Sequence, residues 1–361
     1  MRRTSIVLLA GFAFLALLVS PANGKDCPTR DRTVTVMTRN LDAGSDFGYV
    51  LQAASDPSAT QLQLLMAITN TFQEMIASDI PRRAQRIAVE VQARQPYLIG
   101  LQEVTTLRTG AAGMPADQVV VDGLQSLLDA LAARGLHYAP LAVQTNAVVD
   151  LPAFDATGNL ITVGFTDSDA VLARTDLAVS ELKILGVDMQ HFNVVLPFTV
   201  AGQTIPFLRG WISLDAKVRG RNYKFVTTHL ETFSPDIQAE QTSELLAGPL
   251  NSELPVVLAG DLNSDANQPS WANGPAFEIL VAAGFHDVWS ALRRPNPGLT
   301  WPLFAEDPNG PAIPRQRIDF VLTRGDSLKA KTIVRTGLSP SAKGVWGSDH
   351  TGVFGVFALL P

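Results

Sequence analysis

The sequence has little of what stabilises small extracellular folds. Cys27 is the only cysteine among 361 residues, so no disulfide can form within the chain and no zinc site can rest on several thiolates. Charged residues make up 17% of the chain and hydrophobic residues 46%, which indicates a packed core and not a disordered polymer. Stability must therefore come from the core and from any bound metal.

Basic residues are also scarce. The chain has 28 Lys and Arg against 34 Asp and Glu, a formal net charge of −6. This excludes a strongly basic surface that coats nucleic acid. It does not exclude an enzyme that cuts nucleic acid, because a bound metal supplies positive charge locally.

The longest apolar run is short and lies at the N-terminus. Arg2 and Arg3 precede the run 6–19, and the small residues of 20–24 follow it. A bilayer-spanning helix needs roughly 20 apolar residues, whereas this pattern is typical of a secretory signal peptide. We expect cleavage after residue 24, a mature domain of 25–361 with no membrane span, and a secreted or periplasmic location. The alternative is an uncleaved membrane anchor. Cleavage would remove two Arg and no acid, so the formal charge would become −8.

The remainder of the chain alternates short apolar strands with amphipathic helical patterns, and no linker divides it. Some neighbouring strands are joined by a turn and others by a helix, which predicts one α/β domain with mixed sheets. The expected strands are 33–40, 97–102, 170–173, 204–216, 222–229, 255–260, 318–322 and 351–359; the expected helices are 60–77, 82–94, 122–134, 236–246 and 276–283; a long loop is expected at 290–314.

Polar side chains that can contact a metal or a phosphate stand where these strands begin or end. Singly, such a residue is usually a turn former or a packing residue. Together they favour a functional site, because polar groups flush against apolar runs are costly unless they are satisfied. The residues are Asn40, Glu103, His229, Asp261, Asn263, Asp319, Asp349 and His350.

Short motifs around these residues occur in the order found in one family. Over 33–357 the chain resembles the endonuclease/exonuclease/phosphatase superfamily, which includes pancreatic-type DNase and bacterial sphingomyelinases. The resemblance implies an α/β (α+β) four-layer sandwich, with two mixed β-sheets packed face to face and helices outside. Relative to compact members, 44–80 looks like an insertion. The motifs are TRN at 38–40, GLQEV at 100–104, THLE at 228–231, GDLNSD at 260–265, GSDH at 347–350 and, more weakly, RIDFV at 317–321.

The resemblance also implies a Mg²⁺ or Mn²⁺ cofactor. Glu103 is its expected principal ligand, with Asn40 beside it, and Asp349 is expected to support the metal or position His350. Hard divalent cations take oxygen ligands and retain several waters, so few protein ligands suffice when phosphate supplies others.

The remaining motif residues are expected to act on the phosphate. Asp261 would orient or deprotonate water, and Asn263 would donate to nonbridging oxygens. His229 and His350 would flank the phosphorus as charged donors. Asp319 would hold the leaving-group side or orient a histidine.

Three further residues are interpreted more openly. Asp169 is expected to pair with His229 and raise the pKa of its imidazole; the alternative is an ordinary turn residue in the sequence DSD. Asp42 is interpreted as a solvated loop residue, and Arg209 as structural.

These inferences predict a secreted, metal-dependent phosphoester hydrolase. We expect a monomeric phosphodiesterase that acts on nucleic acid or phospholipid headgroups. The alternative is an inactive module of the same fold that binds phosphorylated ligands. Trp289, Trp301 and Phe304 can serve a lipid-binding role, but their pattern is more typical of packing.

Overall fold

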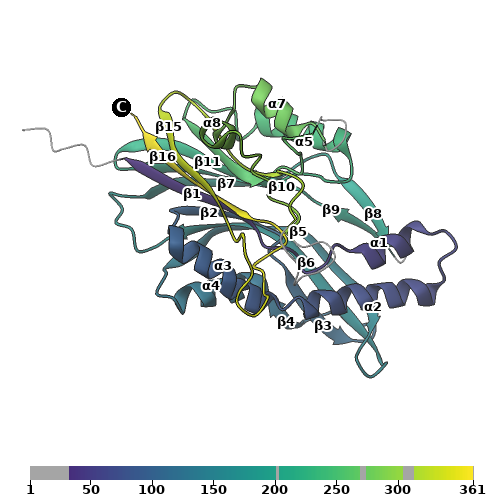
Figure 1. Cartoon of the computed structure of the whole chain (residues 1–361). Helices are drawn as coiled ribbons and strands as arrows, with labels where there is room; N and C mark the ends of the chain where they lie inside the picture. Colours follow the sequence, from purple (N-terminus) through teal and green to yellow (C-terminus); the bar gives the residue numbers. More distant parts are fainter. Residues whose placement is uncertain (1–31, 201–202, 269–273, 304–312, 361) are drawn as a thin grey trace, which may run out of the picture. The chain divides into compact units, whose positions relative to one another are not determined.

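Figure 1 shows the computed structural model of the chain, which describes residues 32–200, 203–268, 274–303 and 313–360. The predicted signal peptide, Cys27 and Phe304 lie outside the described residues. Among the helices that are described, none has the length and apolarity needed to cross a membrane.

The first sheet has eight strands. β1 and β2 run parallel, and the other pairs are antiparallel, so the sheet is mixed. Its order is β15 (Leu328–Thr336), β16 (Gly352–Leu359), β1 (Thr33–Asn40), β2 (Leu98–Gln102), β6 (Leu160–Arg174), β3 (Thr106–Ala111) and β4 (Gln118–Asp122), with β5 (Tyr138–Phe154) also paired to β6.

The second sheet has six strands and is mixed as well, because β11 and β12 are parallel and their neighbours antiparallel. A separate hairpin joins β8 (Leu196–Val200) to β9 (Gln203–Phe207). The six-stranded order is β13 (His286–Asp287), β14 (Asp319–Arg324), β12 (Val256–Asp261), β11 (Arg221–His229), β10 (Gly210–Val218) and β7 (Lys183–His191).

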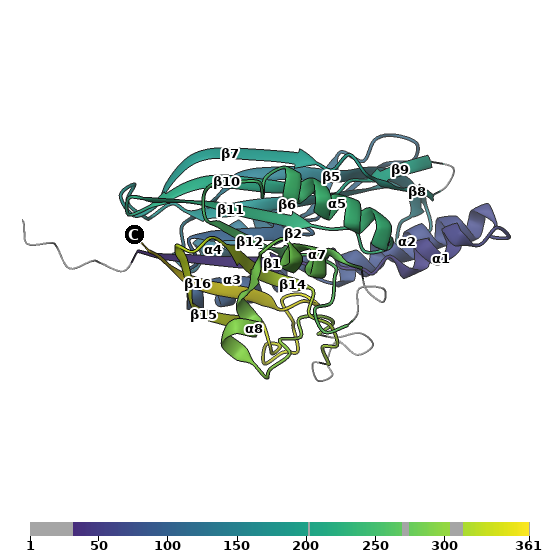
Figure 2. The same cartoon turned by 90° about the horizontal axis from the view of Figure 1, so that it is seen from above.

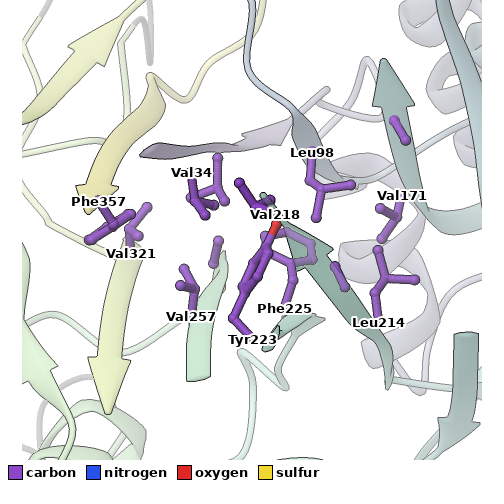
Figure 3. Packing of buried hydrophobic residues seen from close by; sticks show 14 of the residues in the cluster. Val34, Leu98, Val171, Leu214, Val218, Tyr223, Phe225, Val257, Val321 and Phe357 are labelled. Carbon is purple, nitrogen blue, oxygen red and sulfur yellow. The ribbon is translucent and has the colours of Figure 1, made fainter. Parts of the chain in front are cut away.

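The two sheets pack face to face. Figure 3 shows side chains of β1, β2 and β6 meeting those of β10, β11, β12 and β14 in one hydrophobic cluster. Phe225 and Tyr223 of β11 are fully buried in this layer. Burial of a side chain such as that of Phe225 contributes about 1.5–3 kcal/mol, and this core holds the two sheets together.

Helices cover the outer faces, as Figures 1 and 2 show. Side chains of α3 and α4 pack on the first sheet, and those of α5 and α7 on the second. The predicted four-layer sandwich is therefore confirmed. The helices are α1 (Gly48–Ser55), α2 (Gln61–Ala77), α3 (Ile80–Arg94), α4 (Gly123–Ala132), α5 (Pro235–Ala247), α7 (Ala276–Ala282) and α8 (Val288–Arg293).

Two predicted elements are wrong. The expected strand 204–216 is broken at Leu208 and Arg209, between β9 and β10. At the break the N–H of Leu208 donates to the carbonyl of Asn146, and Arg209 turns toward a cleft that also contains His229. The expected loop 290–314 starts inside α8, because Asp287 caps the N-terminus of that helix.

The segment 44–80 forms α1, α2 and the start of α3. Thr60 caps α2 with a capping box completed by Gln63, an arrangement that satisfies two backbone groups at once. α2 contacts β5, and its buried residues Ile68, Phe72 and Met75 join a separate hydrophobic cluster. Whether 44–80 is an insertion relative to other members stays a prediction.

Candidate active site

Strand register brings the predicted polar residues to one edge of the sandwich. On adjacent strands of the second sheet His229 pairs with Asp261, and Asp261 pairs with Asp319. In the first sheet Asn40 pairs with Gln102, the residue before Glu103. Each polar group lies at or next to the end of a strand whose adjacent residues are buried, so the sheets act as a rigid support for the site.

The two sheets approach closely just behind this edge. A Cβ at Gly100 of β2 would collide with the hydroxyl of Thr227 on β11, so glycine permits the contact. Buried Gln102 accepts a hydrogen bond from Thr38 and donates one to Thr227, both at 3.0 Å. This polar bridge fixes the spacing between β1 and β2 on one side and β11 on the other.

The side-chain amide of Asn40 holds two carboxylates together. Its Nδ2 donates to Glu103 Oε1 at 2.8 Å and to Asp261 Oδ2 at 3.1 Å. The second oxygen of Glu103 accepts the N–H of Ala43 at 2.8 Å. Glu103 has a φ of 54°, a left-handed backbone that non-glycine residues adopt at a cost, and such strain concentrates at functional sites.

His350 forms an ion pair with Asp319. Its Nδ1 lies 2.9 Å from Asp319 Oδ2 and 3.8 Å from Asp261 Oδ2, and its Nε2 lies 3.9 Å from Asp349 Oδ1. Burial opposes the charged imidazole, but Asp319, Asp349 and Asp261 outweigh it and raise the pKa of His350 well above its usual value. The contacts therefore favour the charged imidazole, in which Nδ1–H donates to Asp319 and Nε2–H is available.

His229 is in the opposite state. Arg209 Nη1 lies 2.8 Å from His229 Nδ1, and a guanidinium only donates, so Nδ1 accepts and the proton of the neutral ring is on Nε2. Burial, followed by the charges of Arg209 and His350, lowers the pKa of His229 well below its usual value. The prediction that both histidines are charged donors is wrong for His229.

Asp169 lies beside His229, but no hydrogen bond joins the two side chains. The closest approach is 4.0 Å, from Asp169 Oδ1 to His229 Nδ1, because Arg209 occupies that nitrogen. Asp169 is a buried residue of β6, so the turn alternative is wrong too. Asn146 Nδ2 donates to Asp169 at 3.0 Å and to Asp167 at 3.2 Å. Burial raises the pKa of both carboxyls, that of Asp167 to about 7.

The last two predicted residues complete the set. The backbone N–H of Asn263 donates to Asp261 Oδ1 at 2.9 Å, and its side-chain Nδ2 donates to the carbonyl of Leu230 at 2.9 Å, which leaves one N–H of that amide. Asp349 Oδ2 accepts the indole N–H of Trp301 at 2.8 Å. Trp301 is half-buried, lies next to His350 and also lines the cleft.

Several residues of this network were not predicted from the sequence. Arg39, inside the TRN motif, is fully buried and donates to the carbonyls of Asn40 and His350. In the sequence, only the position of Arg39 within the TRN motif indicated that it belongs to the site. Arg209 and Asp42 were assigned weaker roles, yet Arg209 sets the tautomer of His229, and Asp42 pairs with Arg83 at 3.0 Å. Asp42 is therefore not a solvated loop residue.

The donor set suits a hard divalent cation. Asp261, Asp319 and His350 offer atoms within 4.8 Å of one another, the spacing of a metal site. The Nδ1 of His350, however, is already used to donate to Asp319. Burial first, then Asp319, raises the pKa of Asp261 to about 7, a penalty that a nearby cation would relieve. The carboxylate oxygens of Glu103 and Asp261 therefore fit Mg²⁺ or Mn²⁺ better than a set containing His350. The expected ligand role of Asn40 is not seen, because its Nδ2 faces the two carboxylates and its Oδ1 accepts the N–H of Asp42 at 2.8 Å.

These groups open into a single cleft of about 1040 Å³. Glu103, His229, Asp261, Asn263 and His350 line one part of it. The cleft thus presents acidic oxygens, a neutral imidazole and a cationic imidazole to the same ligand. Such a set can bind a metal–phosphate group and transfer protons to and from it.

Comparisons with known proteins agree with this geometry. The model of the Endonuclease/Exonuclease/phosphatase family matches residues 70–350. Among curated proteins, no sequence matches the chain.

Solved structures show the same fold at low identity. A family protein from Leptotrichia buccalis is 17% identical with a TM-score of 0.52, covering 90% of this chain and 100% of that one. One from Beutenbergia cavernae is 22% identical with a TM-score of 0.53, covering 91% and 72%. The human Nocturnin catalytic domain with bound sulfate anion is 14% identical with a TM-score of 0.52, covering 91% and 95%. Because the family model spans most of the sequence and the fold agrees, the chain belongs to the endonuclease/exonuclease/phosphatase family.

Proposed function

We propose that the protein is a secreted, Mg²⁺- or Mn²⁺-dependent hydrolase of phosphodiesters. The observation that carries the proposal is the unbroken series of contacts from Glu103 through Asn40 and Asp261 to His350 and Asp319. This series gathers oxygens for a hard cation and a charged donor for phosphate in one cleft. The predicted signal peptide supports the location, and a monomeric state stays a prediction.

Within this proposal each residue has a task that its contacts allow. Glu103 would hold the cation, which supplies positive charge to the phosphate when bound, and Asn40 would keep the carboxylate of Glu103 beside that of Asp261. Asp261 would orient water and accept its proton, because its carboxylate lies between Asn40 and His350 at the centre of the series. His350, charged and fixed by Asp319, would donate through Nε2 to a phosphate oxygen.

His229 and Asn263 would flank the same phosphate. The neutral ring of His229 carries its proton on Nε2, 3.6 Å from Asp261 Oδ2, and Arg209 prevents the ring from turning over. The remaining amide N–H of Asn263 is free for a nonbridging oxygen. Asp349 would steady His350 through its contact at 3.9 Å in place of binding the metal directly, because Trp301 uses one of its oxygens.

Release of p-nitrophenol from bis-p-nitrophenyl phosphate tests the proposal. We expect turnover with Mg²⁺ or Mn²⁺, none after a chelator, and recovery when the metal is restored. A folded protein that binds phosphate but shows no metal-dependent turnover of any phosphoester would instead support the inactive binding module.

A further inference from the structure

The catalytic groups occupy only one part of the cleft. The other part, here called the apolar chamber, lies between α1 and α2 on one side and strands β5, β6, β8 and β9 on the other. Side chains from each of these elements line it, among them Val50, Phe72, Leu151, Val163, Phe198 and Ile205.

A series of phenyl rings runs along the chamber. Phe47 lies 5.5 Å from Phe165 and 6.3 Å from Phe207, centroid to centroid. Phe198 links Phe207, at 6.2 Å, to Phe233, at 5.6 Å. All five rings line the cleft, and none is fully buried. Aromatic surface left accessible within a cavity marks a binding site for apolar groups.

The chamber and the catalytic groups are built on the same strands. Phe165 precedes Asp169 on β6, and Phe207 ends β9 two residues before Arg209. Phe233 follows His229 by four residues, in the connection to α5. Because the five rings and His229 line one cleft, a ligand whose phosphate lies at His229 would extend toward the phenyl rings.

The charges of the lining residues disfavour a polynucleotide. Among the described lining residues Arg209 and Arg315 are the only arginines or lysines, and Arg209 is committed to His229. Asp42, Asp46 and Glu74 add negative charge on the α1–α2 side. A nucleic-acid strand needs basic contacts along its backbone, whereas a hydrocarbon chain needs only apolar surface shielded from water.

We propose that the substrate is an amphiphilic phosphodiester whose hydrocarbon chain occupies the apolar chamber. This inference rests on the proposed function. Water would add to phosphorus and a P–O ester bond would break, and the leaving alcohol would take a proton. The products are a phosphomonoester and an alcohol. The segment 44–80 then has a role, because α1 and α2 supply one wall of the chamber.

The test uses p-nitrophenyl alkyl phosphates with methyl, butyl, octyl and dodecyl chains, each below its critical micelle concentration and with Mg²⁺. We expect kcat/KM of the full-length protein to rise by up to about fourfold per buried methylene. Metal-dependent hydrolysis with no dependence on chain length would overturn the chamber inference and leave the proposed function standing. Faster cleavage of plasmid DNA or RNA than of the dodecyl ester would overturn it as well.

Adjacent residues of β9 give a matched pair of variants. Ile205 is half-buried and lines the chamber, whereas Thr204 is exposed and does not. Ile205→Arg should flatten the dependence on chain length, and Thr204→Arg should retain it. If circular dichroism shows that Ile205→Arg is unfolded, Phe198→Ala at the chamber rim replaces it. An equal dependence of kcat/KM on chain length in the lining and control variants would contradict the inference.

A binding measurement separates the two proposals. Alkyl phosphates of the same chain lengths are titrated calorimetrically into the Glu103→Gln variant, in which turnover is expected to be lost. Tighter binding of dodecyl than of butyl phosphate supports the chamber even if no ester is hydrolysed. Affinity independent of chain length overturns the chamber whatever the activity.

Discussion

The buried residues Arg39 and Glu90 are predicted to stabilise the fold through their ion pair and the site through the hydrogen bond from Arg39 to His350. Arg39 Nη2 lies 3.0 Å from Glu90 Oε1, with side-chain exposures of 0% and 8%. Thr336 donates to the other oxygen of Glu90 at 2.7 Å, and Arg39 Nη1 donates to the carbonyl of His350 at 2.7 Å. Glu90→Leu would leave the guanidinium buried without its counter-charge, at a cost of about 3–5 kcal/mol.

Urea unfolding measures this cost, with Glu181→Leu as the control. Glu181 pairs with Arg219 at 2.9 Å but its side chain is 35% exposed, so its loss should cost at most about 1 kcal/mol. The double variant Arg39→Met with Glu90→Leu should recover much of the stability but not the turnover, because the carbonyl of His350 loses its donor. Equal unfolding midpoints for Glu90→Leu and wild type would refute the reasoning.

Three further predictions concern the histidines. Activity that needs charged His350 is present below the pKa of His350 and is lost above it. Asp319→Asn removes the charge that raises this pKa, so the basic limb of kcat against pH should move to lower pH. The rate should also fall about 10- to 150-fold, the effect of losing one charge-assisted hydrogen bond. An unmoved limb would exclude this role. Asp169→Asn should leave the basic limb of kcat against pH in place, since Asp169 lies 4.0 Å from His229. A shift of that limb would instead support a functional pair of Asp169 and His229. Arg209→Met removes a positive charge, so NMR titration should show a raised His229 pKa, and an unchanged one would contradict the assignment.

The mixed sheets and the clustering of polar residues at strand ends were predictable from local pattern, whereas the face-to-face packing of two sheets followed from the family resemblance. Apolar strands followed by a polar residue recur along the sequence, and neighbouring strands in register place those residues side by side. His229, Asp261 and Asp319 are aligned in this way on β11, β12 and β14. The motifs that contain them carried the family resemblance but did not predict the order of the strands within each sheet.

The protonation states of the histidines were not predictable, because they depend on which side chain forms a hydrogen bond with each ring nitrogen in the folded protein. A carboxylate near His229 suggested a charged imidazole, whereas the break before β10 brings Arg209 to that nitrogen instead. The chamber was not predictable from the sequence, because it depends on long-range packing. Among the described strands, β8 and β9 pair with each other and join neither large sheet. Strand β7 was not predicted either, because it is largely exposed and lacks the alternation of buried and exposed residues that indicates a strand.

The central claim is that the oxygens around Glu103 hold a cation needed for phosphodiester hydrolysis. Comparing Glu103→Gln with Glu240→Gln, an exposed residue of α5, tests it most directly, through calorimetric Mn²⁺ affinity and turnover of bis-p-nitrophenyl phosphate on the same samples. Glu103→Gln should unfold at the wild-type urea concentration, bind Mn²⁺ weakly and lose turnover by at least about 100-fold, while Glu240→Gln behaves as wild type. Wild-type Mn²⁺ affinity and turnover in folded Glu103→Gln would contradict the claim.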